Sequence, residues 1–329
     1  MVKGVRRIGK SSLIRVGLSL HGNGLHLVLD ARSIPVLSTD TVYDLLARSL
    51  NNLMTRTSLG AVLSSALSRV EGISISGVQI GIRKRRPDVL VEVAEALGEV
   101  AERTGKKLVL VFDEAQDFRI VPGFTRMLAH IYDYIDNAKI VLAGSEVGLL
   151  DKLLGKNNPG APLYGRAFLE IEMRRLSREA SIDFLTRGFE ELGMKWPQQY
   201  IEEAVDSLDG IPGWLTSYGY YSYVYRDHKR ALEKTLEEGA SIVRSEIERF
   251  LANRVAARTR YLSLLRCLSL RDMRWTELKR CLETSIGKQL NQSQFNRYVR
   301  ELRDYGFIEK RDEYYTLADP LIRHAVTRY

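Results

Sequence analysis

The sequence has few of the features that define disulfide-rich, zinc-binding or membrane proteins. Cys267 and Cys281 are the only cysteines in 329 residues, so there is no disulfide framework and no CxxC zinc pattern, and we expect two buried free thiols. No stretch approaches the roughly 20 apolar residues that a membrane-spanning helix needs. Four basic residues among the first ten exclude a secretory signal. We therefore expect a cytoplasmic protein with no membrane partner.

Length and charge suggest several domains and one basic end. A chain of 329 residues can bury the cores of two or three domains. The net charge of +8 is uneven, because the stretch from Arg258 to Tyr329 holds 15 lysines and arginines against 9 aspartates and glutamates. A local basic excess favours a polyanionic partner, although the arginine- and glutamate-rich surfaces typical of thermophiles would look similar.

The first 150 residues alternate between strand and helix patterns. Two of the strands are continuously apolar, which is typical of a parallel sheet covered by helices on both faces. The expected strands are Leu25–Leu29, Leu108–Phe112 and Lys139–Ala143, the expected helices are Ser11–Leu20, Thr39–Asn51, Val89–Thr104 and Val121–Tyr134, and a hairpin is expected over Ile73–Ile82. The pattern predicts an α/β fold with a three-layer αβα parallel sheet over residues 1–172.

The remainder of the chain divides into a helical segment and a smaller mixed unit. Residues 173–256 are helical in pattern. Residues 257–329 contain three helix patterns followed by a β-hairpin, the order of a winged helix-turn-helix. The expected elements are helices at 261–269, 275–283 and 293–305 and strands at 307–310 and 314–317.

The segment Gly4–Ser11 satisfies every fixed position of the phosphate-binding pattern G-x-x-x-x-G-K-[ST]. Gly4 and Gly9 permit backbone angles that turn successive N–H groups toward a phosphate, and the following helix offers its N-terminal dipole. Lys10 would reach the β- and γ-phosphates, and the Ser11 hydroxyl would ligate Mg²⁺. Arg7 and Ser12 complete the predicted nucleotide contacts in this segment. The alternative is a glycine-rich turn that matches by chance.

A pair of carboxylates, Asp113 and Glu114, follows the buried strand Leu108–Phe112. The carboxyl end of a parallel strand faces the ligand crevice of an α/β sheet. Asp113 can hold Mg²⁺ through water, and Glu114 can orient and deprotonate the attacking water. Two carboxylates after a strand can also be a helix cap, but the upstream phosphate loop favours the catalytic interpretation.

Two further residues are candidates for roles in hydrolysis. Ser145 follows the strand Lys139–Ala143 at the same expected sheet edge and could sense the γ-phosphate or position the water. Turn chemistry alone would explain it equally well. Arg166 is a candidate for stabilising transition-state charge, within the chain or across an interface, against the alternative of a solvated arginine.

These segments together resemble the archaeal ATPase family, a branch of the STAND and AAA-like P-loop NTPases. The resemblance covers most of the chain and is carried by Gly4–Ser11, Leu29–Arg32, Phe112–Gln116, Gly144–Leu150, Pro162–Ala167 and Gly210–Leu215. It implies a core that binds ATP rather than GTP, a helical lid that carries Pro212 near the nucleotide, and a C-terminal winged helix. It does not identify the biological role of the protein.

The sequence departs from the family pattern at its start. In such NTPases a central strand precedes the phosphate loop, but here only Met1-Val2-Lys3 precede Gly4, too few for a strand of typical length. We therefore expect the first strand to be missing or truncated, which leaves an unfilled slot in the sheet. Either the start of the chain was assigned too late, or the protein is a truncated copy that binds nucleotide poorly; the intact downstream pattern favours the former.

The third helix of the winged-helix segment separates apolar from polar residues. Phe295, Val299 and Leu302 share one face and should pack inward. The opposite face carries side chains suited to base edges and phosphates, and the nucleic-acid candidates are Gln294, Asn296, Arg297, Arg300 and, at the wing, Arg311. A solvated face or a surface docked on protein would look similar, and the acidic Asp312 and Glu313 argue against a wing in the minor groove.

The leading hypothesis is a nucleotide-controlled switch: an Mg²⁺-dependent ATPase whose winged helix acts on double-stranded DNA or on a protein partner. The first alternative is a DNA-binding protein similar to archaeal origin-recognition ATPases, with ATP as a structural ligand. The second is a degenerate scaffold that does not hydrolyse ATP. An oligomer is compatible with all three, and the sequence does not distinguish among them.

Overall fold

The computed structural model describes residues 1–22, 24–77, 79–86, 88–156 and 158–327. The chain divides into two compact units, which are described one at a time. The first unit contains Met1–Lys3 and Lys10–Glu172, and the second contains Gly4–Gly9 and Met173–Tyr329. The predicted division into three domains, with boundaries at 172 and 256, stays a proposal.

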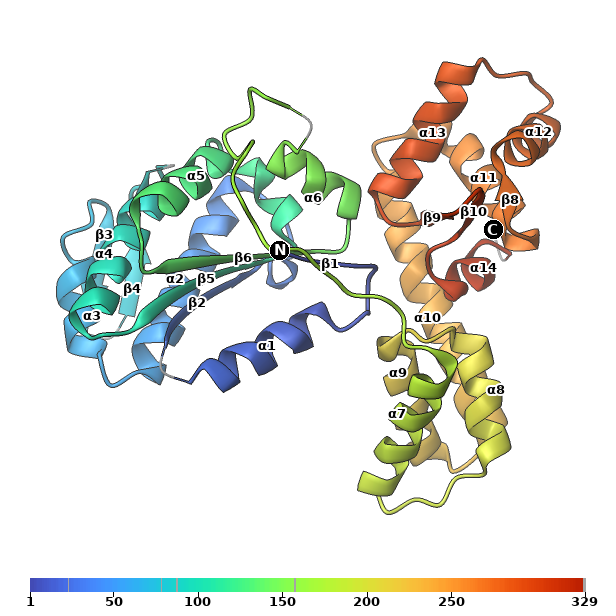
Figure 1. Ribbon diagram of the computed structural model, residues 1–329, viewed down its shortest axis with the longest axis horizontal. Coiled ribbons are helices and arrows are strands. Elements are labelled where there is room, and N and C mark those ends of the chain that lie inside the picture. The colour runs from blue at the N-terminus through green and yellow to red at the C-terminus, as the bar shows by residue number, and fades with distance from the viewer. Residues whose placement is uncertain (23, 78, 87, 157, 328–329) are drawn as a thin grey trace. The chain divides into compact units, whose positions relative to one another are not determined.

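A five-stranded parallel sheet forms the centre of the first unit, with the strand order β2-β5-β6-β1-β7 (Figure 1). The strands are β1 Val2–Lys3, β2 Gly24–Asp30, β5 Lys107–Asp113, β6 Ala138–Gly144 and β7 Ile171–Glu172. β5 is buried from Leu108 to Asp113, because it lies inside the sheet with helices on both faces. The predicted α/β sheet is confirmed.

Among the described residues of this unit, six α-helices accompany the sheet, and α1 lies on the opposite face from α5 and α6 (Figure 1). The helices are α1 Lys10–His21, α2 Thr39–Arg56, α3 Gly60–Leu67, α4 Val89–Arg103, α5 Phe124–Tyr134 and α6 Val147–Leu154. Ser38 caps α2 at its N-terminus, and its hydroxyl accepts the Thr41 N–H in a capping box. The predicted hairpin is formed by β3 Ile73–Ser76 and β4 Gln79–Ile82, and Val78 lies outside the described residues.

The slot for the first strand holds a two-residue strand. Val2 pairs with Ala143 of β6 and with Ile171 of β7, and Lys3 continues both pairings. A short first strand is therefore present, and the expectations of a missing strand and of an unfilled slot are wrong. β1 covers only the last two residues of β6, and Ile140 and Val141 remain partly exposed.

Four helices make up the first part of the second unit: α7 Arg178–Glu191, α8 Gln198–Leu208, α9 Pro212–Tyr225 and α10 His228–Leu251. Ser177 and Asp227 cap α7 and α10 through their side-chain oxygens, and Pro212 occupies the first position of α9. Gly210 has a positive φ of 66°, and a β-carbon there would approach the Leu176 carbonyl oxygen, so the turn before α9 requires glycine.

The predicted winged helix-turn-helix is present in the same unit (Figure 1). Its elements are α11 Arg258–Leu270, β8 Met273–Arg274, α12 Trp275–Ile286, α13 Gln292–Asp304, β9 Ile308–Arg311, β10 Tyr314–Leu317 and α14 Pro320–Val326. Phe295, Val299 and Leu302 of α13 are buried, as their spacing predicted. Within the described residues, no helix is long and apolar enough to cross a membrane.

The expectation of two free thiols is wrong. Cys267 of α11 and Cys281 of α12 form a disulfide, with 6.1 Å between their α-carbons. That separation lies within the usual range for disulfides of about 4.4–6.8 Å. The spacing of the cysteines in the chain gave no sign of the bond, because only the packing of α11 on α12 brings them together.

Candidate functional site

Two predicted metal ligands from distant parts of the sequence meet at one sheet edge of the first unit. Ser11 lies in the first turn of α1, and Asp113 is the last residue of β5. The Ser11 hydroxyl donates a hydrogen bond of 2.6 Å to Asp113 Oδ2. The Asp113 side chain is buried, and its Oδ1 accepts the Glu114 N–H. A hydroxyl and a carboxylate are therefore held together at the start of the helix that follows the phosphate loop.

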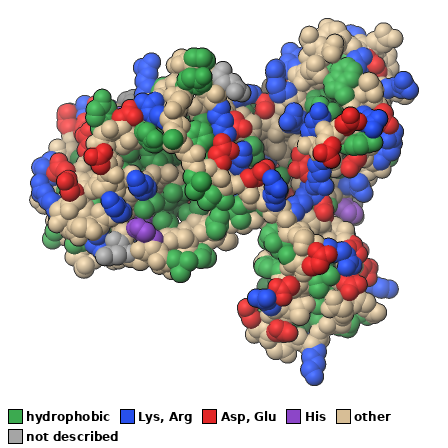
Figure 2. Space-filling view, in the orientation of Figure 1, with side chains coloured by type: hydrophobic (Ala, Val, Ile, Leu, Met, Phe, Trp, Pro, Cys, Tyr) green, Lys and Arg blue, Asp and Glu red, His purple; other side chains and the backbone are tan. Residues whose placement is uncertain are grey.

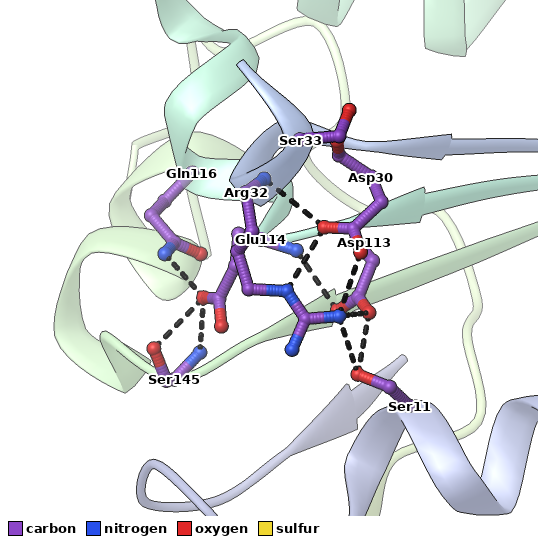
Figure 3. Close-up of polar contacts among 8 residues, drawn as sticks. All are labelled: Ser11, Asp30, Arg32, Ser33, Asp113, Glu114, Gln116 and Ser145. Carbon is purple, nitrogen blue, oxygen red and sulfur yellow. Dashed lines mark hydrogen bonds and ion pairs between the residues drawn. The ribbon is translucent and has the colours of Figure 1, made fainter. Parts of the chain in front are cut away.

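An arginine that sequence analysis did not assign joins this pair (Figure 3). Arg32 Nη2 lies 2.7 Å from Asp113 Oδ2 and 2.9 Å from Ser11 Oγ. Asp30, the last residue of β2, binds the same guanidinium through both of its carboxylate oxygens. The hydrogen bond from Asp30 raises the pKa of Arg32, against the opposing effect of burial, and Asp113 raises it further.

Glu114 lies beside this group in a separate hydrogen-bonded cluster (Figure 3). Its Oε2 accepts hydrogen bonds from Gln116 Nε2 at 2.8 Å, from Ser145 Oγ at 2.8 Å and from the Ser145 N–H at 3.0 Å. Burial raises the pKa of Glu114, but the Lys10 ammonium and these hydrogen bonds outweigh it, so the pKa is lower than its ordinary value. Glu114 is therefore an ionised carboxylate near neutral pH, able to accept a proton.

The residues at this edge fit a magnesium ion. Mg²⁺ binds oxygen ligands, usually one or two protein groups together with substrate phosphates and water. Ser11 Oγ and Asp113 Oδ2 are such oxygens, 2.6 Å apart, and they already accommodate a cation in the form of Arg32 Nη2. Ser11 and Asp113 would hold the metal.

The segment Gly4–Gly9 belongs to the second unit and leads directly into α1 in the chain. Gly4 and Gly9 have positive φ angles of 153° and 95°, as the phosphate-loop pattern requires. A β-carbon on Gly4 would also approach the Met173 carbonyl oxygen. The Arg7 carbonyl accepts the N–H of Gly213, which adjoins the predicted nucleotide contact Pro212 at the start of α9.

Some predicted site residues gather at the sheet edge and one lies apart. Lys10 is almost fully buried at the start of α1, and Ser12 next to Ser11 is exposed. Ser145 lies at the carboxyl end of β6, in contact with Glu114. Arg166 instead binds Asp133 of α5, with Nε 3.0 Å from Oδ1, and also bonds to the Pro162 carbonyl. A catalytic role for Arg166 stays a prediction.

The nucleic-acid candidates are exposed on the winged helix, four of them on α13 and Arg311 on β9. Gln294, Arg297 and Arg300 are exposed on α13. Two other candidates already have partners, because Asn296 accepts the Trp275 indole N–H at 2.8 Å and Arg311 forms an ion pair with Glu309 at 2.6 Å. On the face seen in Figure 2, the basic side chains of the second unit are interspersed with acidic ones.

Sequence analysis missed three contributors to the site: Asp30, Arg32 and Gln116. Asp30 ends a parallel strand of the same sheet, as Asp113 does, so the same sheet-edge argument would have found it. Arg32 and Gln116 belong to two of the segments that carry the family resemblance, but a single sequence gives no sign of their partners. Gln116 is buried beside Glu114, where its amide N–H₂ orients the carboxylate.

Comparison with protein families gives two matches. Residues 1–218 match an ATPase domain described as predominantly from Archaea, which covers well over half of the chain. Residues 255–318 match the C-terminal winged helix-turn-helix domain of MCM proteins. No curated protein matches the sequence.

Solved structures share the fold. The Walker-type ATPase PABY2304 of Pyrococcus abyssi is 29% identical, with a TM-score of 0.80 over 99% of this chain and 90% of that one. The ORC2 protein of Aeropyrum pernix, solved in ADPNP–ADP complexes, is 15% identical, with a TM-score of 0.60 over 100% of this chain and 86% of that one. At that identity the second likeness concerns the fold alone.

Proposed function

Since this chain belongs to the family of ATPase domains found predominantly in Archaea, we propose that it binds ATP with Mg²⁺ and hydrolyses it slowly as a switch. The observation that carries the proposal is the hydrogen bond between Ser11 and Asp113, with the ionised Glu114 beside it. P-loop enzymes that hydrolyse nucleotides use the same groups: a hydroxyl and an acid for the metal, a second acid for the water, and a lysine for the phosphates. In this chain they are Ser11, Asp113, Glu114 and Lys10. The match to a family of ATPase domains supports ATP as the nucleotide.

Each residue has a defined part in this proposal. Lys10 and the N–H groups of the phosphate loop bind the β- and γ-phosphates and neutralise their charge. Ser11 and Asp113 hold Mg²⁺, which neutralises charge on the phosphate oxygens when it is bound. Glu114 orients the attacking water and accepts its proton on a carboxylate oxygen. Ser145 keeps Glu114 in place through two hydrogen bonds.

Asp113→Asn tests the metal site because asparagine preserves the shape of the side chain and removes its charge. We expect Mg²⁺ to strengthen ATP binding in the wild type but not in this variant, measured by nucleotide titration with and without EDTA. Asp136→Asn, at an exposed aspartate, is the matched control and should behave as wild type. Equal dependence on Mg²⁺ in all three proteins would contradict the proposed site.

The switch requires a link between the phosphate loop and the winged helix, and Arg7 supplies one inside the second unit. Its guanidinium lies 4.3 Å from the centre of the Trp214 ring and binds Glu246 of α10 at 2.7 Å. The Trp214 indole in turn donates to Asp319, the cap of α14. A phosphate-loop arginine thus touches the helical segment, and its Nη1 also lies 3.8 Å from Asp319 Oδ2 at the start of α14 in the winged helix. Nucleotide binding that moves this loop would therefore change the contacts that hold the start of α14.

Hydrogen exchange tests this link. In the wild type we expect Mg²⁺–ATP to change the exchange of amides in α14, and Arg7→Ala should lose that change. Arg15→Ala, at an exposed arginine of α1, is the control and should retain it. Loss of the response at α14 with ATP binding intact would support the link. An unaltered response in Arg7→Ala would contradict it.

DNA binding is a second candidate function. The match to a winged-helix domain and the exposed Gln294, Arg297 and Arg300 support it. Each phosphate that the protein neutralises releases counterions, so binding should weaken as salt rises. If α13 binds DNA, Arg297→Gln and Arg300→Gln together should reduce the salt slope by about two, because two phosphates are no longer neutralised. Arg230→Gln at the start of α10 is a control, and an unchanged slope in the α13 variant would contradict DNA binding through α13.

A further inference from the structure

One nitrogen of Arg32 is surrounded by oxygens of the kind that magnesium selects. Nη2 lies within 2.9 Å of Ser11 Oγ, Asp30 Oδ2 and Asp113 Oδ2 (Figure 3). These oxygens come from α1, β2 and β5, so the guanidinium joins three separate elements at the sheet edge. Two of the three belong to the residues that would hold the metal.

The contacts of Arg32 fall into two groups. Asp30 makes three contacts with it: Oδ1 accepts Nε at 2.9 Å and the Arg32 backbone N–H at 3.0 Å, and Oδ2 accepts Nη2 at 2.8 Å. Ser11 and Asp113 are reached by Nη2 alone. The Arg32 side chain is 48% exposed, so its end can turn outward while the bond to Asp30 persists. The contacts with Ser11 and Asp113 can therefore be exchanged without releasing the residue.

We propose that Arg32 is a built-in competitor for the magnesium position. Its guanidinium holds Ser11 and Asp113 in place when no metal is bound, and a divalent cation must displace it, because a guanidinium and a metal ion cannot occupy one position between the same oxygens. A bare ion, which gains few ligands here, displaces Arg32 poorly. An ion that arrives with a triphosphate brings additional oxygens and displaces it readily. The inference rests on the metal site of the proposed function and adds a positioning residue that makes metal binding depend on nucleotide.

Binding of Mn²⁺ alone tests the competition without requiring hydrolysis. Arg32→Gln removes the charge and keeps a planar hydrogen-bond donor. With Asp30 and Asp113 no longer neutralised, we expect this variant to bind Mn²⁺ about tenfold more tightly than wild type, or more, since charge-assisted hydrogen bonds of this strength correspond to at least that factor. Free Mn²⁺ is measured by electron paramagnetic resonance on the full chain. Arg48→Gln, at an exposed arginine of α2, is the matched control and should bind as wild type.

Arg32→Lys keeps the charge and guards against a folding defect in the glutamine variant. It should bind Mn²⁺ more like wild type than like Arg32→Gln, because a cation still faces Asp113. If Arg32 were only a structural clamp, both variants would lower the melting temperature and leave Mn²⁺ affinity unchanged. Equal affinity in wild type and Arg32→Gln would overturn the proposal, whether or not the wild type hydrolyses ATP. Loss of ATP turnover alone bears on the proposed function and not on this competition.

Discussion

The Ser11 hydroxyl donates to the Asp113 carboxylate across 102 positions of sequence. This hydrogen bond unites the residue that follows the lysine of the phosphate loop with the acid at the end of β5, as the two sequence patterns predicted separately. Because Asp113 is buried, the pair is fixed in position before any ligand binds. The proposed metal site is thus part of the folded first unit and does not depend on an interface.

Lys10→Ala should weaken ATP binding strongly. Lys10 is nearly buried beside Glu114, and its ammonium would supply charged hydrogen bonds to the β- and γ-phosphates. Loss of such bonds costs about 1.5–3 kcal/mol each, which corresponds to roughly tenfold to a hundredfold in affinity. Titration with a fluorescent ATP analogue measures this. Lys107→Ala removes an exposed lysine and should bind as wild type. Unchanged affinity in Lys10→Ala would remove Lys10 from the site.

The sheet edge could be predicted from sequence, but its side-chain partners could not. Local sequence patterns identify the main site residues. The phosphate-loop pattern at a helix N-terminus identifies Gly4, Lys10 and Ser11, and the end of a buried strand identifies Asp113. Arg32 stands outside such a pattern. Its position depends on how β2, β5 and α1 pack, which is a tertiary relationship that periodicity does not encode.

The same contrast between local patterns and tertiary contacts explains why the sequence predicted an unfilled slot for the first strand and two free thiols. The two-residue strand β1 forms because β6 and β7 supply partners on both sides, whereas the length of Met1–Lys3 alone argued against a strand. The disulfide Cys267–Cys281 likewise depends on the packing of α11 against α12. Helices α11, α12 and α13 of the winged helix were predicted well, since the apolar face of α13, for example, is visible in its own sequence, whereas α14 was not predicted.

Acid should weaken the attachment of β1. Lys156 and Lys3 bind Glu170 just before β7 and lower its pKa to about 2. A lowered carboxyl pKa stabilises the fold above the ordinary value of about 4.5, and this contribution is lost as pH falls toward 2. We therefore expect Glu170→Gln to be less stable than wild type at pH 6, with the difference vanishing near pH 2.

Urea unfolding at several pH values checks this, with Glu102→Gln at an exposed glutamate of α4 as the control. Amide exchange at Val2 and Lys3 should rise over the same pH range in the wild type. A stability difference between wild type and Glu170→Gln that is independent of pH would show that the ion pairs do not contribute in this way.

Reduction of the disulfide should destabilise the winged helix. The two cysteines are 14 positions apart in the sequence. In the chain-entropy account, a disulfide that closes a loop of this length stabilises the folded state by about 3 kcal/mol. Thermal unfolding with and without reductant should show this loss in the wild type, and a Cys267→Ala, Cys281→Ala variant should be insensitive to reductant. Two titratable thiols in the untreated native protein would contradict the bond.

In the proposed mechanism, Glu114 deprotonates the water that attacks Mg²⁺-bound ATP. The most direct test of this mechanism is parallel measurement of ATP affinity and phosphate release in Glu114→Gln, with Glu102→Gln as the control. We predict that Glu114→Gln binds Mg²⁺–ATP as tightly as wild type and releases phosphate at least about a hundredfold more slowly, within the range for loss of a general base. Phosphate release at the wild-type rate by Glu114→Gln would contradict the account.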